Sequence, residues 1–184
     1  VGCDKKEPTS SKTTSTKSAS PTFGKLTSRT EKGLNGTIRI ADQSLRVTPF
    51  VSHDQHSDLK TNCLKAYDDA KKNGNDNPIL CYDKKPRTKV STLRIETYTP
   101  KGFEQARANM AKSSEGTHFM IRSSGSIYQM LDLAYAVRRD GELRPNEVRV
   151  LSAFPAKEEV LFKELKTYLP RIKLEKHGHV SDSK

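Results

Sequence analysis

The sequence predicts a mixed α/β domain in which helices flank a central β-sheet. From about residue 89 onwards, segments that alternate like strands are interleaved with segments whose apolar residues recur at helical spacing. Their order is strand, helix, hairpin, strand, helix, which is typical of a sheet with helices packed on it. The 184 residues are enough for one domain with tails.

The elements of this main domain, residues 88–180, follow from local signals. Pro155 can begin a helix and Pro170 can end it, while Thr99-Pro100 is a typical helix start. Segment 131–137 is apolar and predicts either the end of a strand or a short helix. The other expected elements are strands over 90–98, 148–151 and 172–174, helices over 101–112 and 155–169, and a hairpin over 117–130, followed by a polar tail at 181–184.

Residues 23–87 are expected to form an extension packed on this domain. Segments 36–41 and 45–51 alternate and predict two strands, and segment 59–72 has the apolar spacing of a helix. The short apolar run at 79–82 predicts another strand.

The loop at 53–58 holds two His and two Asp, which are residue types that bind metals. The alternative interpretation is a polar loop in which Ser57 or Asp58 caps the following helix.

Cys63 and Cys81 would close a loop of 17 intervening residues. In an oxidising compartment they could form a disulfide that stabilises the fold by about 3 kcal/mol. Two buried free thiols are the alternative, and spacing does not choose between them.

The amino-terminal segment, residues 1–22, predicts a disordered tether. It is nearly all Ser, Thr, Lys and Pro, so it cannot bury enough apolar surface to offset the entropy of ordering. Its start, Val1-Gly2-Cys3, resembles the end of a bacterial lipobox. That resemblance implies lipidation at Cys3 and a membrane-anchored lipoprotein on the periplasmic side of a bacterial envelope.

The formal charge of +11 favours a polyanionic partner, either nucleic acid, acidic lipid or an anionic wall polymer. The sequence lacks the aromatic and basic RNA-binding signature, glycine-rich phosphate loops and zinc-finger spacings, and the lipobox-like start also argues against a nucleic-acid partner. No apolar run reaches the roughly 18 residues of a membrane span.

Residues 117–132, THFMIRSSGSIYQMLD, resemble the "HF-I-DG-IYQ--D" hairpin of zinc-dependent N-acetylmuramoyl-L-alanine amidases and peptidoglycan recognition proteins. Residues 131–141 are similar to the family's "DLRYAAWHAG", residues 146–150 to its Asn-led strand, and residues 156–169 to its long helix. The resemblance covers about residues 88–180. It implies an amidase-like fold, and a role for His118 as a core residue of the strand.

The resemblance also identifies where the family's catalytic zinc would lie. Glu96 occupies the place of the first ligand, and Gly178-His179-Val180-Ser181-Asp182 resembles the "GHSD" loop of the second. The third ligand position falls beyond Lys184, although Asp182 could take its place. Three protein ligands and a water make an open catalytic zinc site, so Glu96, His179 and Asp182 are the candidate ligands.

Together these observations predict a degenerate, non-catalytic amidase-like domain without a cofactor. It would serve as a scaffold that binds peptidoglycan, with Arg122, Arg138 and Arg139 as contacts, or another envelope protein. The alternative is an active zinc amidase that cleaves the bond between muramic acid and the stem peptide.

Overall fold

The computed structural model describes residues 35–53, 58–99 and 102–178. The predicted tether at 1–22 with Cys3, and the carboxyl-terminal segment with His179 and Asp182, lie outside the described residues. None of the helices in the described part of the chain is long and apolar enough to cross a membrane.

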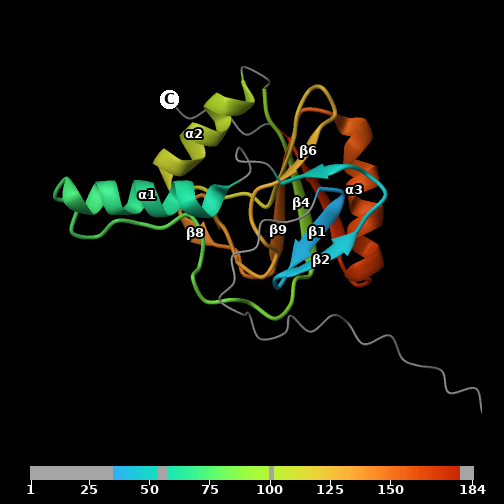
Figure 1. The fold of residues 1–184 in the computed structure, drawn as a ribbon, viewed down its shortest axis with the longest axis horizontal. Helices are drawn as coiled ribbons and strands as arrows, with labels where there is room; N and C mark the ends of the chain where they lie inside the picture. The colour runs from blue at the N-terminus through green and yellow to red at the C-terminus, as the bar shows by residue number, and fades with distance from the viewer. Residues whose placement is uncertain (1–34, 54–57, 100–101, 179–184) are drawn as a thin grey trace, which may run out of the picture.

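A mixed six-stranded sheet with helices on both faces forms the centre of the fold, which confirms the predicted α/β class (Figure 1). The four strands β10, β4, β9 and β5 run parallel, β6 is antiparallel to β5, and β3 runs parallel to β6 at the far edge. In spatial order the strands are β10 (Lys173–His177), β4 (Thr92–Thr97), β9 (Glu147–Ser152), β5 (Phe119–Ile121), β6 (Ile127–Gln129) and β3 (Val51–Ser52).

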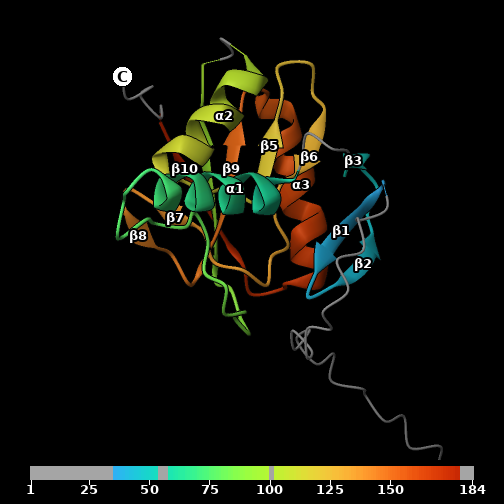
Figure 2. The same ribbon diagram turned by 60° about the vertical axis from the view of Figure 1, so that its left-hand side comes forward.

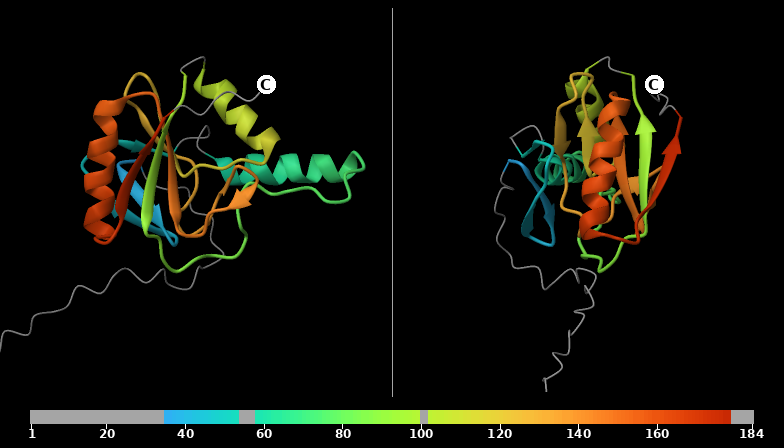
Figure 3. Two further views of the ribbon diagram at one scale, coloured as in Figure 1. Left: turned by 180° about the vertical axis from the view of Figure 1, so that it is seen from behind. Right: turned by 90° about the vertical axis from the view of Figure 1, so that its right-hand side faces the viewer.

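The helices lie on opposite faces of this sheet. Helix α3 (Pro155–Tyr168) covers one face, while α1 (Leu59–Lys72) and α2 (Phe103–Ser113) lie on the other, as Figures 2 and 3 show. The carboxyl-terminal half of α1 projects away from the body of the domain (Figure 1).

Alternation along the strands gives each face its own core. Leu93 and Ile95 of β4 pack with Leu161 and Leu165 of α3 in one buried cluster. A second cluster lies under α1 and α2, with Met120 of β5 among its buried members. Because neighbouring residues of a strand point to opposite faces, the residues between the apolar ones face α1 and α2.

The first helix begins where the sequence predicts. Of the two candidate caps, Asp58 is the one used, because its carboxylate accepts the Thr61 backbone N–H over 3.0 Å and the Thr61 hydroxyl over 2.7 Å. Helix α2, by contrast, begins at Phe103 after Gly102, so the predicted start at Thr99 was wrong.

A separate hairpin packs beside α3. Its strands β1 (Thr37–Ile40) and β2 (Gln43–Arg46) are antiparallel, and their turn holds Ala41 and Asp42 at φ 52° and 65°. Left-handed backbone costs L-residues roughly 1–2 kcal/mol each. The Asp132 carboxylate offsets this cost by accepting both turn N–H groups, over 2.8 and 2.9 Å. A second short hairpin joins β7 (Arg138–Arg139) to β8 (Glu142–Leu143).

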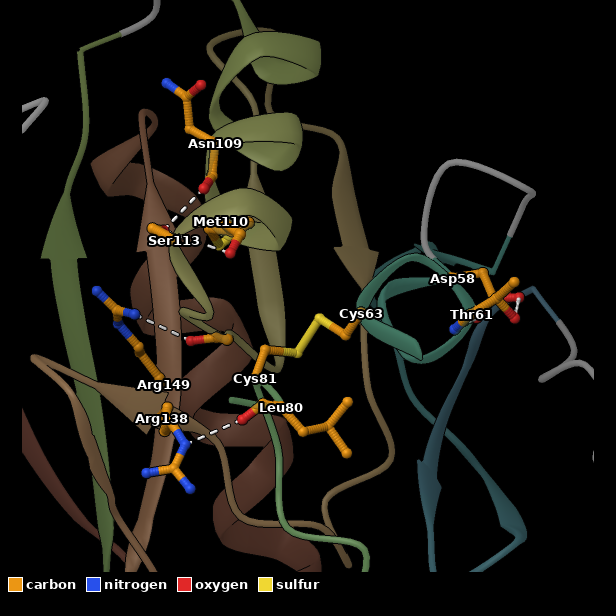
Figure 4. The surroundings of a disulfide bond; sticks show 11 residues. Asp58, Thr61, Cys63, Leu80, Cys81, Asn109, Met110, Ser113, Arg138 and Arg149 are labelled. Atoms are coloured by element: carbon orange, nitrogen blue, oxygen red, sulfur yellow. Dashed lines mark hydrogen bonds between the residues drawn. A yellow bond between two sulfur atoms is a disulfide. The ribbon is translucent and has the colours of Figure 1, made fainter. Parts of the chain in front are cut away.

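The described part of the predicted extension is built into the main domain. Strand β3 pairs with β6 and so belongs to the central sheet. Cys63 on α1 and Cys81 are joined by a disulfide, which ties the helix to the loop that leads into β4 (Figure 4).

Two predicted elements of the sequence analysis were wrong. Residues 79–82 form no strand and contribute only the single bridge between Tyr82 and Val137. Two carbonyl groups of this segment accept hydrogen bonds from Arg138 instead. Its side-chain Nε donates to the Leu80 carbonyl over 2.9 Å (Figure 4), and its backbone N–H donates to the Cys81 carbonyl over 2.8 Å. Segment 131–137 is neither strand nor helix.

The predicted strand over 45–51 is interrupted. Strand β2 ends at Arg46 and β3 begins at Val51, with Pro49 between them. Proline has no N–H for a strand ladder, so the run divides into two strands.

Candidate functional site

The face of the sheet under α1 and α2 carries charged residues at its centre. Strands β4 and β9 are parallel and in register, with Arg94 opposite Arg149. Both residues alternate with apolar residues of the α3 face, as does Glu96. The alternating patterns of β4 and β9 therefore bring their charges together on one face.

Arg149 is the most enclosed of these charges, with a side chain only 4% exposed. Its Nε donates to Glu96 Oε2 over 2.5 Å, and its Nη1 donates to Glu115 Oε2 over 2.8 Å and to the Gly116 carbonyl over 3.0 Å. The second oxygen of Glu96 accepts from Arg94 Nε over 3.2 Å. Both carboxylate oxygens of Glu96 thus face guanidinium groups.

A second ion pair lies beside the first. Arg139 donates through Nε and Nη2 to the two oxygens of Glu147, over 2.9 and 3.1 Å, and through Nη1 to Asp140 over 2.9 Å. The hydrogen bond to Glu147 raises the pKa of Arg139. Glu115 connects the two pairs, because its other oxygen accepts the Asp140 N–H over 2.8 Å.

His118 lies next to this network as a fully buried, neutral residue. Its Nδ1 accepts the Arg149 backbone N–H over 3.0 Å, so Nε2 carries the proton and donates to the Tyr135 carbonyl over 2.8 Å. Burial first, and then the positive charge of Arg87, lower its pKa well below the usual value. His118 is a satisfied core residue, as the resemblance implied.

Arg87 was missed by the sequence analysis, although it holds the loop before β4 in place. Its Nε donates to the Leu133 carbonyl over 2.8 Å and its Nη1 to the Glu147 carbonyl over 2.6 Å. Burial lowers its pKa to about 9, so the group still carries its charge at neutral pH. Its Nη2 lies 3.1 Å from His118 Nε2. Both nitrogens are donors, so this contact is not a hydrogen bond.

The surroundings of Glu96 do not fit a zinc ligand. A carboxylate binds a divalent cation through its oxygens, whereas each oxygen of Glu96 already accepts a hydrogen bond from a guanidinium group, that of Arg149 or that of Arg94. A metal ion there would also lie against two positive charges. No group of three potential metal ligands occurs among residues 35–53, 58–99 and 102–178. On β10, the neighbour of Glu96 in register is His177, whose ring Nε2 lies 3.5 Å from Glu175 Oε2.

The other predicted metal loop is described only in part. His53 Nε2 lies 2.8 Å from the Thr37 carbonyl, so the ring is used in a structural contact. Burial, opposed by that hydrogen bond, lowers the pKa of His53. His56 lies outside the described residues.

The three arginines predicted to bind peptidoglycan do not form one site. Arg122 follows the end of β5, with its guanidinium 4.9 Å from the centre of the Phe103 ring. Arg138 and Arg139 lie at the other end of that strand, where the Arg138 carbonyl accepts the Gly116 N–H over 3.0 Å. Arg138 and Arg139 are also engaged in internal hydrogen bonds, and the role of the three arginines as peptidoglycan contacts stays a prediction.

A groove of about 330 Å³ lies beside the tip of the β5–β6 hairpin. The β5–β6 turn, strand β3 and the first turn of α3 all contribute to it. Two aromatic residues, three serines and one lysine are among the nine residues that line it, which are Pro49, Phe50, Ser52, Ser124, Gly125, Ser126, Ile127, Tyr128 and Lys157. We name these nine residues the hairpin groove.

The hairpin groove could have been found from the sequence only in part. The Ser-Ser-Gly-Ser turn predicts an exposed tip, and Gly125 adopts φ 86°, which favours glycine. Phe50 and Lys157 are distant in sequence, and no local pattern indicates that they meet there.

Comparison of the chain with protein-family models, with curated proteins and with solved structures gave no match.

Proposed function

We propose that this chain is a non-catalytic, amidase-like domain of a bacterial cell-envelope lipoprotein, which is anchored through Cys3 and binds peptidoglycan. The order of elements supports the proposal. The succession of β4, α2, the β5–β6 hairpin, β9 and α3 is the order in the amidases that the sequence resembles.

The observation that carries the non-catalytic part is the pairing of Glu96. This residue stands where the resemblance puts the first zinc ligand, yet its carboxylate bonds to Arg149 and Arg94. Catalysis by such an enzyme needs zinc to lower the pKa of a bound water and to polarise the amide carbonyl. A carboxylate held between two guanidinium groups favours a domain that has kept the fold and lost this chemistry.

The charge of the chain supports a wall polymer as ligand. Peptidoglycan is anionic, and the chain carries a net charge of +11. Attraction between such charges is screened over about 8 Å at physiological ionic strength, so binding should weaken as salt is added.

The test is a pair of measurements on the full chain, purified without a chelator and without a His tag. Co-sedimentation with purified peptidoglycan sacculi should show salt-sensitive binding. Metal analysis should find far less than one zinc per chain, and incubation with sacculi should release no stem peptides.

Near-stoichiometric zinc that is lost in His179→Ala, together with stem-peptide release, would establish the zinc amidase instead. Failure to bind sacculi under any salt condition would refute the wall-binding function. A pull-down from envelope extracts would then test the remaining use of the fold, as a scaffold for another envelope protein.

A further inference from the structure

We propose that two copies of the chain associate through β10, the strand at one edge of the central sheet, so that their sheets join into one. The partner that this surface fits is a second copy in antiparallel orientation. The inference goes beyond the wall-binding function and does not depend on it, because it rests on the backbone and the charges of the strand itself.

Strand β10 is an open edge of the sheet. Among the described strands it pairs only with β4, and four of its five residues are exposed. The right panel of Figure 3 shows that no other element of the described ranges lies beyond β10, and that α3 is set in from it towards the middle of the sheet. Such an edge is a template for pairing with another chain, because its outer backbone groups have no strand partner.

The hydrogen bonds to β4 determine which backbone groups face outward. The Lys173 N–H donates to the Ser91 carbonyl over 2.9 Å. In a parallel pair every second residue bonds to the same neighbour, so Lys173 and each second residue after it turn their backbone groups towards β4. Leu174 and Lys176 therefore turn theirs to the open edge. The Ile172 carbonyl also faces outward, because the C=O and N–H groups of a trans peptide point in opposite directions.

One antiparallel register fits the charges of β10. With Leu174 opposite Leu174 of the second copy, the two leucines exchange both backbone hydrogen bonds, and each Lys176 N–H meets the Ile172 carbonyl of the other copy. Lys173 of each copy then lies directly opposite Glu175 of the other, and opposite charges in such positions attract. The two neighbouring symmetric registers pair Lys173 with Lys173 or Glu175 with Glu175. The charge pattern therefore favours a second copy and selects its register.

Lysines on an edge strand usually prevent this kind of pairing, but both lysines of β10 find carboxylates in the proposed dimer. Lys176 Nζ lies 2.9 Å from Glu159 Oε1 and 3.6 Å from Glu158 Oε2, both on α3 of its own copy. Lys173 meets Glu175 of the second copy. Neither lysine brings an unpaired charge to the junction.

The experiment measures the mass of the full chain by analytical ultracentrifugation over a range of concentrations. Cys3→Ser serves as the background, so that no disulfide through that residue can join two copies. Strand junctions of this size bind weakly, so concentrations up to about 500 µM are needed. We expect a reversible equilibrium between a monomer of 20.6 kDa and a dimer of twice that mass.

Charge reversal tests the register. Lys173→Glu or Glu175→Lys alone places like charges at both pairs, so each should raise the dissociation constant of the dimer about tenfold. The double variant Lys173→Glu, Glu175→Lys exchanges the two charges and should dimerise like the unaltered chain. An equal mixture of the two single variants should also dimerise, because each copy then meets its complement.

Leu174→Pro tests the backbone contact. Proline removes an N–H that faces the open edge and leaves those that bond to β4, so the fold should be retained while the dimer is lost. Lys163→Glu is the matched control, because it reverses an exposed charge on α3 rather than on β10, and it should leave the equilibrium unchanged. Far-ultraviolet circular dichroism should give the same spectrum for every variant.

Three results would overturn the inference. The first is a single species of 20.6 kDa over the whole concentration range. The second is a dimer that persists unchanged in both single charge reversals, since it would form through another surface. The third is a double variant that fails to recover the dimer, which would show that Lys173 and Glu175 do not face each other.

Discussion

Replacing Glu96 with Gln should lower the free energy of unfolding by about 3 kcal/mol. Removing one partner of a buried ion pair typically costs about 3–5 kcal/mol, because the other charge is left uncompensated. Arg149 would keep Glu115 and the Gly116 carbonyl, which places this variant at the lower end of that range. Arg149→Met should cost more, because Glu96 would be left with Arg94 alone.

The double variant isolates the interaction between the two residues. Glu96→Gln combined with Arg149→Met removes both charges, so its cost should fall short of the sum by about 2 kcal/mol. An exposed pair gives the matched control. Lys176 and Glu159 are 48% and 54% exposed, so Glu159→Gln should change the free energy of unfolding by less than about 0.5 kcal/mol.

The assay is urea unfolding followed by far-ultraviolet circular dichroism, because the chain contains no Trp. The same titrations should be repeated with zinc. A ligand present at 100 times its dissociation constant would stabilise the fold by about 2.7 kcal/mol. If zinc stabilised the unaltered chain and not Glu96→Gln, Glu96 would be a metal ligand and the non-catalytic function proposed for this domain would be refuted. A coupling energy below about 0.5 kcal/mol would refute the ion-pair argument by itself.

Three further predictions concern stability. Reduction of the Cys63–Cys81 disulfide, whose residues are 18 apart, should lower the free energy of unfolding by about 3 kcal/mol, measured by urea unfolding with and without reductant. The pKa of His118 is lowered in the folded state, so only the unfolded chain takes up a proton at this residue as the pH falls below 6.5. The free energy of unfolding should therefore fall below pH 6.5 by up to about 1.4 kcal/mol per pH unit and stay level above it. Asp132→Ala should cost about 2 kcal/mol, since two backbone N–H groups of the β1–β2 turn lose their acceptor, and thermal unfolding would report it.

Each of these predictions has its own control. A Cys63→Ser, Cys81→Ser chain should be insensitive to reductant, and sensitivity would contradict the disulfide. His118→Gln should reduce the fall in the free energy of unfolding below pH 6.5. His53→Gln should reduce this fall by a smaller amount. Asp42→Gly should recover part of the loss in Asp132→Ala, because glycine adopts the left-handed turn without strain.

Local signals predicted the elements that are stabilised by their own residues. Helix α1 has a capping Asp58 and regular apolar spacing, and α3 begins at Pro155, so both were found within one or two residues. The β5–β6 hairpin was found because Ser-Ser-Gly-Ser leaves few alternatives to a turn.

The features that the sequence did not predict depend on contacts between residues that are distant in the chain. Residues 79–82 look like a strand, but Arg138 and the disulfide determine their path. The role of Glu96 could not be predicted from the sequence for a similar reason. Glu96 appears as a possible ligand in isolation, and only the register of β4 with β9 shows that Arg149 neutralises it.

The position of β4 in the sheet determines when the chain can complete its fold during synthesis. Both neighbours of β4 come later in sequence, β9 by about fifty residues and β10 by about eighty. A nascent chain that ends before β10 leaves β4 as an open edge, and its partners are not yet made. Such a topology delays stable folding until nearly the whole chain has emerged.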